Sequence, residues 1–183
     1  MATHAVPAPL AQLPNALTVL RLALIPLFVA LLLRADGEAS WAAGLVFAAA
    51  GVTDQVDGWL ARRWSVESRF GKLADPLADR LMIDAAVVLL WLDDRLPWPA
   101  LAIVLARDAL LVGGYKVVVP LGYDFEVTRV GKLATWLLYA GVALLIVTSS
   151  GTEWPLWLFW LGVALAVVAA AQYVLKARRE VRT

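Results

Sequence analysis

The sequence contains no cysteine and only one histidine, His4. The lack of cysteine excludes thiol catalysis, disulfide bonds and thiolate metal sites. Because His4 lies near the N-terminus, outside every apolar segment, neither a Ser-His triad nor a histidine-ligated zinc site is expected. Any catalytic chemistry in this chain must therefore depend on other residue types.

Charge is also scarce: 17% of the 183 residues are charged, 62% are hydrophobic, and the mean hydropathy is +0.75. Soluble domains are about 45 to 50% apolar, so the composition predicts an integral membrane protein. Six apolar stretches are long enough to cross a bilayer as helices. They are Leu17 to Leu33, Trp41 to Trp59, Ala78 to Leu92, Pro99 to Val119, Leu133 to Ser149 and Pro155 to Leu175.

The sequence thus predicts an all-α, polytopic membrane protein with six transmembrane helices in a single domain, residues 1–183. The N-terminus lacks the basic start of a signal peptide, so the first apolar stretch is expected to remain as a membrane helix. Residues 8–13 could form a short juxtamembrane helix in the interface, with Pro7 and Pro14 limiting its length.

The Lys and Arg residues are distributed unevenly about these stretches. Of the sixteen, Arg21, Arg80 and Arg107 lie well within spans, and only Arg34 and Arg95 fall on one side of the predicted membrane. The other eleven lie on the opposite side: Arg62, Arg63, Arg69, Lys72, Lys116, Arg129, Lys132, Lys176, Arg178, Arg179 and Arg182. By the positive-inside rule, both termini and the connection after the second span face the cytoplasm.

Four carboxylates interrupt the apolar pattern in and after the second span: Asp54, Asp57, Asp75 and Asp79. A carboxylate at membrane depth costs about 2.5 to 3.5 kcal/mol on insertion scales, so four together need positive charge. Spacings of three and four residues place each pair on one face of its helix. The pattern predicts a carboxylate cage for two Mg²⁺ or Mn²⁺ ions, which suits phosphoryl transfer.

Small and basic residues accompany these carboxylates. Gly58 and Ala61 form a small helical face that could admit a nucleotide, and Arg62 could contact a phosphate with two hydrogen bonds. The alternative is that Gly58 and Ala61 only allow close helix packing, as small residues often do in membranes. Beside four aspartates, we favour the binding role.

The string Asp54-x2-Asp57-Gly58-x2-Ala61-Arg62-x8-Gly71-x3-Asp75-x3-Asp79 resembles the signature of the CDP-alcohol phosphotransferase family. The first helix, from Pro14 to Arg21, is similar to that of phospholipid-synthesising members, as is Gly131-Lys132-x2-Thr135. The resemblance implies a six-helix, usually dimeric fold that transfers a phosphoalcohol group from a CDP-linked donor to an acceptor hydroxyl and releases CMP. No nucleic acid partner is expected.

The resemblance also implies residue roles. The four aspartates would bind two metal ions, and Asp79 would also be the general base. Gly58, Ala61 and Arg62 would line the CMP portion of the donor site, with Gly71 allowing the chain to turn beside it. An ionised carboxylate can accept the acceptor's proton, although its low basicity leaves much of the barrier to the metal ions.

Other charges within or near the spans suggest an acceptor site. Arg21, Arg107, Arg129 and Lys132 could bind lipid phosphate or the acceptor. Alternatively, Arg107 could form a structural pair with Asp108. Asp84 follows Arg80 by one helical turn and is interpreted as its structural partner rather than a fifth metal ligand.

The first helix and the small size resemble members that use CDP-diacylglycerol. Phosphatidylglycerophosphate-forming members tend to carry Arg-Glu in the fourth span and Lys-x-Lys-Thr at the fifth, whereas this chain has Arg107-Asp108 and Lys132-Leu133-Ala134-Thr135. This departure is more similar to cardiolipin-forming members. We therefore favour phosphatidylglycerol as acceptor, with glycerol 3-phosphate as the alternative.

Two other classes of function are compatible with buried charge. A cation transporter also carries membrane carboxylates, but its polar groups would be spread through the bilayer and accompanied by paired broken helices. A catalytically inert membrane protein would have little reason to keep four intact acidic ligands. The clustering of the four aspartates beside Gly58 and Arg62 favours the enzyme.

Overall fold

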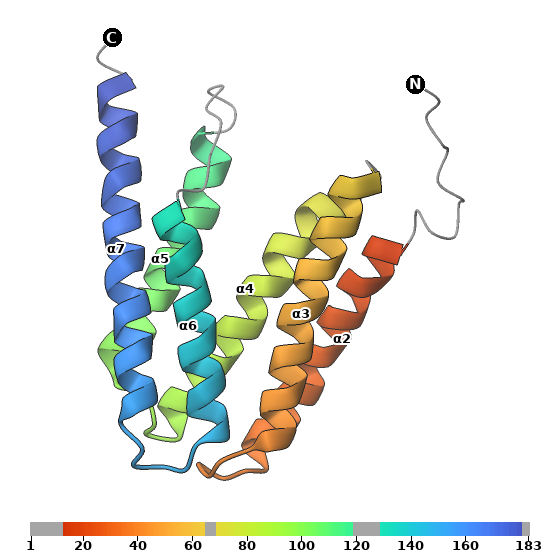
Figure 1. The fold of residues 1–183 in the computed structure, drawn as a ribbon, viewed down its shortest axis with the longest axis vertical. Helices are drawn as coiled ribbons and strands as arrows, with labels where there is room; N and C mark the ends of the chain where they lie inside the picture. The colour runs from red at the N-terminus through yellow and green to blue at the C-terminus, as the bar shows by residue number, and fades with distance from the viewer. Residues whose placement is uncertain (1–12, 65–68, 119–128, 181–183) are drawn as a thin grey trace.

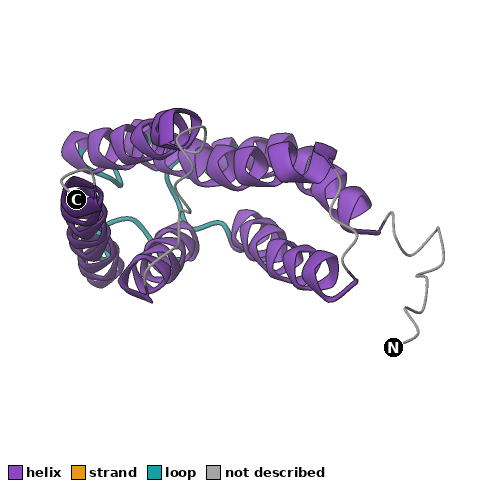
Figure 2. Ribbon diagram, turned by 90° about the horizontal axis from the view of Figure 1, so that it is seen from above, coloured by secondary structure: helices purple, strands orange, loops and turns teal. Residues whose placement is uncertain are grey.

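The computed structural model describes residues 13–64, 69–118 and 129–180, with side chains for residues 16–53, 55–56, 80–110 and 129–172. The described residues form six α-helices, with no strand among them (Figure 2). Short loops join α2 to α3, α4 to α5 and α6 to α7. The helices are α2 (Leu13–Leu33), α3 (Trp41–Trp64), α4 (Arg69–Leu92), α5 (Trp98–Val118), α6 (Arg129–Val147) and α7 (Trp154–Glu180). The prediction of an all-α fold is confirmed. The possible juxtamembrane helix, residues 8–13, lies outside the described residues except for Leu13.

Successive helices run in opposite directions (Figure 1). The loops after α2, α4 and α6 lie at the lower end of the molecule in this view. At the upper end α2 begins and α7 ends, and there α3 ends close to the beginning of α4. The termini of the helical bundle are thus at the same end as the helix ends that flank residues 65–68, as the distribution of basic residues predicts.

Among the residues whose side chains are described, three helices are long and apolar enough to cross a membrane: Ala16–Leu33, Arg129–Val147 and Trp154–Gln172. In α3 the apolar part that the structure describes is shorter, Trp41–Thr53. The described parts of α4 and α5 carry charged residues well inside the helix, which lowers their hydropathy. A helical membrane protein is therefore supported. Each of the six predicted apolar stretches corresponds to one of the six helices, but that all six cross the membrane stays a prediction.

The helices extend beyond the predicted apolar stretches chiefly at the upper end. α3 continues five residues past Trp59, and α4 begins nine residues before Ala78. Lys and Arg are good helix formers and can carry their charges into the headgroup region on long aliphatic stems. A prediction from hydropathy alone therefore makes these two helices too short at the upper end of the molecule.

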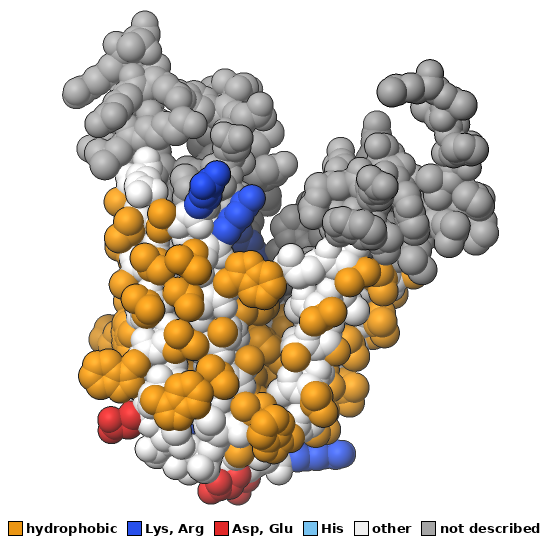
Figure 3. All heavy atoms as spheres, in the orientation of Figure 1, with side chains coloured by type: hydrophobic (Ala, Val, Ile, Leu, Met, Phe, Trp, Pro, Cys, Tyr) orange, Lys and Arg blue, Asp and Glu red, His pale blue; other side chains and the backbone are white. Residues whose placement is uncertain are grey.

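Hydrophobic side chains cover the described helices on the face shown in Figure 3. Basic side chains lie at the upper border of this apolar surface. Acidic side chains lie at the lower end, where a basic side chain is also visible. Many large apolar side chains are exposed, including Trp98, Trp136 and Trp157. Such a continuous apolar surface fits contact with lipid.

The core lies where α4 meets its neighbours, since α4 packs against α2, α3, α5 and α6. Aromatic rings join three other helices: the Phe28 and Phe47 ring centroids are 5.7 Å apart, and those of Phe47 and Tyr139 are 5.6 Å apart. These tilted pairs connect α2, α3 and α6. Because α4 contacts four other helices, the helix that carries Asp75 and Asp79 is held from several sides.

The most extensive helix pair is α6 and α7, and two glycines allow their close approach. A Cβ atom at Gly141 would lie 2.8 Å from Cα of Phe159, and one at Gly162 would lie 2.8 Å from the backbone nitrogen of Leu138. Small residues at such crossings let backbones approach in the membrane, where packing rather than hydrophobic burial drives association.

At the lower end, α4 ends in a Schellman motif. The Arg95 backbone N–H donates to the Leu90 carbonyl, and the Asp94 N–H donates to the Trp91 carbonyl. Asp94 has a positive φ of 55°, a conformation that Asp tolerates better than most residues. This turn brings Arg95 back toward the loops that follow α2 and α6.

The Arg95 guanidinium donates hydrogen bonds to backbone carbonyls of two other loops or helix ends. Its acceptors are the carbonyls of Leu145 and Thr148 at the end of α6 and, at 3.3 Å, the carbonyl of Glu38 in the α2–α3 loop. Carbonyls in the last turn of a helix have no partner within the helix, and a cation is favourable there. Arg95 therefore joins all three lower loops.

We expect Gly162→Ala to lower the thermal stability of the detergent-solubilised protein, because the new Cβ atom meets backbone that cannot move aside. Overpacking of this kind costs about 1 to 3 kcal/mol. Gly51→Ala is the control, since a Cβ atom there meets nothing within 4 Å and Ala is the better helix former. Equal melting temperatures for the two variants would contradict the close α6–α7 packing.

Replacing Arg95 with Met keeps an aliphatic stem but leaves the three carbonyls without their charged donor. We expect a loss of about 1.5 to 3 kcal/mol, the usual range for hydrogen bonds to charged groups, measured as a lower melting temperature. Arg34→Met is the matched control, because the described residues provide no side-chain hydrogen bond for this exposed arginine on the same side of the molecule. If both variants melted alike, Arg95 would have no special role in joining the loops.

Candidate active site

The four aspartates of the motif occupy matching levels on two consecutive antiparallel helices. Asp54 lies ten residues before the end of α3, and Asp79 lies ten residues after the beginning of α4. Asp57 and Asp75 lie seven and six residues from the same helix ends. At 1.5 Å per residue, Asp54 and Asp79 each lie about 15 Å from these helix ends, and Asp57 and Asp75 each lie about 10 Å from them. The helical register thus places each aspartate of α3 at a depth similar to that of one aspartate of α4.

This donor set fits a pair of hard divalent cations. Carboxylate oxygens are the ligands that Mg²⁺ and Mn²⁺ prefer, and aspartates three or four residues apart share a helix face. Their side chains lie outside the described residues. Among the side chains that are described, no group of three His, Cys, Asp or Glu could hold a metal ion. The four aspartates remain the metal ligands that we predict.

The predicted donor site follows the same two helices. Gly58, Ala61 and Arg62 lie in the last two turns of α3, and Gly71 lies in the first turn of α4. Their side-chain surroundings lie outside the described residues, so the CMP-binding role stays a prediction. Their helix positions place all four nearer the upper helix ends than Asp54 and Asp79.

A network of ion pairs joins α4, α5 and α6 at the level of Asp79. Asp108 is buried, and its Oδ1 forms an ion pair with Nη1 of Arg80 at 3.3 Å and accepts a hydrogen bond from Nη1 of Arg107 at 3.2 Å. Arg80 also donates to the Asp108 carbonyl at 3.0 Å. Nη2 of Arg107 donates to Oγ1 of Thr135 at 3.2 Å, and this hydroxyl donates to the Gly131 carbonyl.

The position of this network relates it to the motif. Arg80 follows Asp79 directly in α4, and Asp108 lies ten residues from the upper end of α5. A charge at membrane depth is costly unless it is paired, and Asp108 pairs two arginines at once. The network therefore fixes two guanidinium groups beside the helix segment that carries Asp79.

The structure changes the interpretation of Asp84. We expected it to pair with Arg80 one turn away, but the salt bridge of Arg80 crosses to Asp108 on α5. Asp84 interacts electrostatically with Asp108, Arg80 and Arg107, and its Oδ1 is buried with no hydrogen-bond partner among the described residues. Helical spacing alone could not show that a neighbouring helix would supply the closer carboxylate.

The four basic residues proposed for the acceptor lie in different environments. Arg129 and Lys132 are exposed near the beginning of α6, and Arg107 is partly buried in the network. Arg21 is only 1% exposed, so its guanidinium lies inside the bundle rather than on the lipid-facing surface. The structure joins Arg107 to Thr135 of the α6 motif, and the role of Arg21 stays a prediction.

The pairing of Arg107 with Asp108, which the sequence offers as an alternative, is confirmed. Sequence reasoning missed the second pair of Asp108, because it considered Arg80 only as a partner of Asp84. The signal that could have identified this pair is depth: Arg80 and Asp108 each lie about ten residues from an upper helix end, so adjacent helices bring their charges to one level. The spacing within a single helix does not contain this information.

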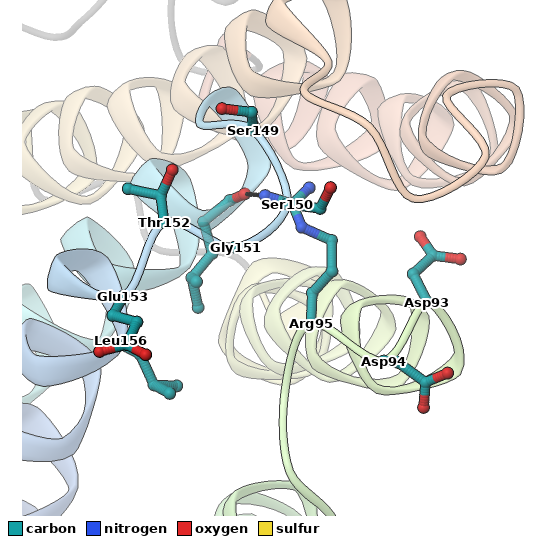
Figure 4. Close-up of a pocket in the computed structure, with 10 residues that line it drawn as sticks. Asp93, Asp94, Arg95, Ser149, Ser150, Gly151, Thr152, Glu153 and Leu156 are labelled. Carbon is teal, nitrogen blue, oxygen red and sulfur yellow. Dashed lines mark hydrogen bonds between the residues drawn. The ribbon is translucent and has the colours of Figure 1, made fainter.

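A cavity of about 320 Å³ lies at the opposite end of the molecule, between the α4–α5 and α6–α7 loops (Figure 4). Its lining includes Asp93, Arg95, Ser149 and Glu153. Burial lowers the pKa of Arg95 and raises that of Asp93 from their ordinary values. Because the Arg95 guanidinium is already bonded to loop carbonyls and the motif lies at the other end, this cavity is not the candidate active site.

The exposed surface of the helices is apolar, and two neighbouring helices carry acidic residues at matching levels. These features are typical of a helical membrane enzyme that uses metal ions. The chain belongs to the CDP-alcohol phosphatidyltransferase family, whose family model matches residues 11–168. The resemblance drawn from the motif is thereby confirmed, and the protein is a phosphatidyltransferase of this family. Members of the family generally use divalent metal ions.

Individual relatives differ in their acceptors. A cardiolipin synthase (CMP-forming) from Streptomyces coelicolor is 43% identical over 145 residues, 76% of this chain and 67% of the relative. CDP-diacylglycerol–glycerol-3-phosphate 3-phosphatidyltransferases from Escherichia coli and Rickettsia typhi are 33% and 31% identical. These matches cover 78% and 77% of this chain, and 90% and 79% of the relatives.

Proposed function

We propose that this chain transfers the phosphatidyl group of CDP-diacylglycerol to phosphatidylglycerol, with cardiolipin and CMP as products. The four aspartates at matching depths of α3 and α4 are the observation that supports the transfer chemistry. The alternative acceptor is glycerol 3-phosphate, which the names of the Escherichia coli and Rickettsia relatives favour. A cation transporter is not supported by the family to which the chain belongs.

The position of Ala134 supports the lipid acceptor. Ala134 is 0% exposed and precedes Thr135, which contacts Arg107. A lysine at position 134, as in the pattern of phosphatidylglycerophosphate-forming members, would bring a further cation into the bundle. Its absence lowers the positive charge available to a soluble phosphate with about two negative charges. A lipid phosphodiester has one charge and is already concentrated and oriented by the bilayer.

In this proposal Asp54, Asp57, Asp75 and Asp79 hold two Mg²⁺ or Mn²⁺ ions, which neutralise the donor's phosphates and the departing oxyanion. Asp79 accepts the proton of the acceptor hydroxyl. Gly58, Ala61, Arg62 and Gly71 bind the CMP portion of the donor. Arg107, Arg129 and Lys132 bind the acceptor phosphate, and both substrates occupy the site together.

We also propose that all six helices cross the cytoplasmic membrane and that both termini and the active site face the cytoplasm. The helix ends next to the basic clusters, including Arg62, Lys72, Lys116, Lys132 and Lys176, all lie at the upper end of the molecule. A homodimer is expected by similarity to the family.

Metal dependence tests the proposed chemistry. We expect CMP release to stop in excess EDTA and to return with Mg²⁺ or Mn²⁺, while Ca²⁺ supports little turnover because of its looser coordination.

Asp79→Asn should lower turnover about 10²-fold or more with a smaller effect on donor affinity, since it removes a general base. The controls are the wild-type protein and Asp94→Asn at the opposite end. Undiminished CMP release in EDTA would contradict the metal site, and an Asp79→Asn variant with more than about a tenth of wild-type turnover would contradict the base.

The acceptor is tested with purified protein and radiolabelled CDP-diacylglycerol. Phosphatidylglycerol, glycerol 3-phosphate, inositol phosphate and serine are offered in parallel, and lipid products are separated. We expect labelled cardiolipin from phosphatidylglycerol, and Lys132→Ala should raise the acceptor KM more than the donor KM. Efficient phosphatidylglycerophosphate synthesis without cardiolipin would show that the acceptor proposal is wrong and leave the metal chemistry intact.

A further inference from the structure

Two arginines and two aspartates lie together at the α4–α5 contact: Arg80, Asp84, Arg107 and Asp108. Their formal charges cancel. The interior of the network therefore offers no surplus positive charge to an incoming anion, although it contains an arginine that we assign to acceptor binding. Such a balance bears directly on which phosphate can bind there.

The two aspartates differ in what they do for the structure. Asp108 accepts from both arginines and is 5% exposed, so its carboxylate is needed to pair them. The Asp84 side chain is within hydrogen-bonding reach of Asp108, whereas its Oδ1 is buried with no hydrogen-bond partner among the described residues. Within the described residues both arginines form their ion pairs with Asp108 rather than with Asp84. The charge of Asp84 therefore acts on the two arginines without an ion pair of its own.

Acceptor phosphates differ in the charge that this carboxylate would repel. A phosphodiester carries one negative charge, whereas a phosphomonoester carries between one and two at neutral pH because its second pKa is about 6. Coulomb repulsion scales with charge and is strong where water is scarce. Asp84 therefore opposes the phosphomonoester more than the phosphodiester, and repulsion of the wrong partner is an effective basis for specificity.

We propose that Asp84 is a specificity-determining residue, whose carboxylate offsets the charge of Arg80 and Arg107 and so favours a singly charged phosphodiester acceptor over a phosphomonoester. This inference rests on the proposed function, because it assumes that Arg107 binds the acceptor phosphate. Asp84 acts at a distance through the two arginines and does not take part in bond making.

The first test uses the wild-type protein with two soluble acceptors that differ in charge and by one methyl group. These are glycerol 3-phosphate and its methyl ester, glycerol 3-(methyl phosphate), each supplied with CDP-diacylglycerol and Mg²⁺. We expect a lower KM for the methyl ester. Because neither acceptor is a lipid, a preference cannot come from concentration in the bilayer. A KM for glycerol 3-phosphate equal to or below that of the ester would overturn the proposal.

The second test changes the carboxylate. In Asp84→Asn, or in Asp84→Ser where the first variant does not fold, we expect kcat/KM for glycerol 3-phosphate to rise about tenfold relative to phosphatidylglycerol, which corresponds to 1.4 kcal/mol. The change should lie in the KM for glycerol 3-phosphate, with the donor KM within about twofold of wild type. Asp84→Glu keeps the charge and should keep the wild-type preference. Asp94→Asn makes the same change at the far end and tolerates its positive φ.

The outcomes separate this inference from the proposed function. If wild type makes cardiolipin but the acceptor ratio of Asp84→Asn is unchanged, the role of Asp84 is wrong and the function stands. If donor and acceptor KM rise together and the melting temperature falls, Asp84 is a structural residue and the inference also fails. If wild type uses glycerol 3-phosphate alone, the proposed acceptor is wrong, and the inference fails with it.

Discussion

The ion pairs of Asp108 with Arg80 and Arg107 are the interaction on which the candidate site depends. In a membrane-embedded segment, each of these charges alone would be strongly unfavourable, and removal of one would leave the others uncompensated. The pairs therefore constrain α4 and α5 to one relative position at the level of Asp79. Through Thr135, Arg107 extends this constraint to α6. Three helices thus share one polar contact beside the predicted metal ligands.

The opposite end of the bundle has a different basis for its rigidity. There, Arg95 bonds to the carbonyls of two other connections, and Gly141 and Gly162 let α6 and α7 pack backbone to backbone. These contacts need no substrate or metal ion. The upper ends of the helices carry basic residues and the motif, whose charges repel one another unless ligands balance them. A firmly packed lower end allows the upper end to be specialised for binding charged groups.

Much of the fold could be predicted from hydropathy. The predicted ends of the first and third spans, Leu33 and Leu92, coincide with the ends of α2 and α4. The upper helix ends could not be predicted in this way, because helix propensity persists through Lys and Arg after apolarity has ended. The motif on α3 and α4 was predictable because its information is local. The partner of Arg80 was not, since the choice between Asp84 and Asp108 is made by helix packing across 28 residues of sequence.

Exposed and enclosed basic residues differ in how they act on an anion. Arg129 and Lys132 are exposed, so salt screens them and they attract anions of many kinds with modest energy. Arg107 is largely enclosed, and there each charge interacts more strongly with its neighbours. If Arg107 binds the acceptor as proposed, discrimination between acceptors is larger there than at the surface. In that proposal Asp84 and Asp108 adjust the charge at the enclosed position, so the choice of acceptor would depend on the carboxylates around the arginine as much as on the arginine itself.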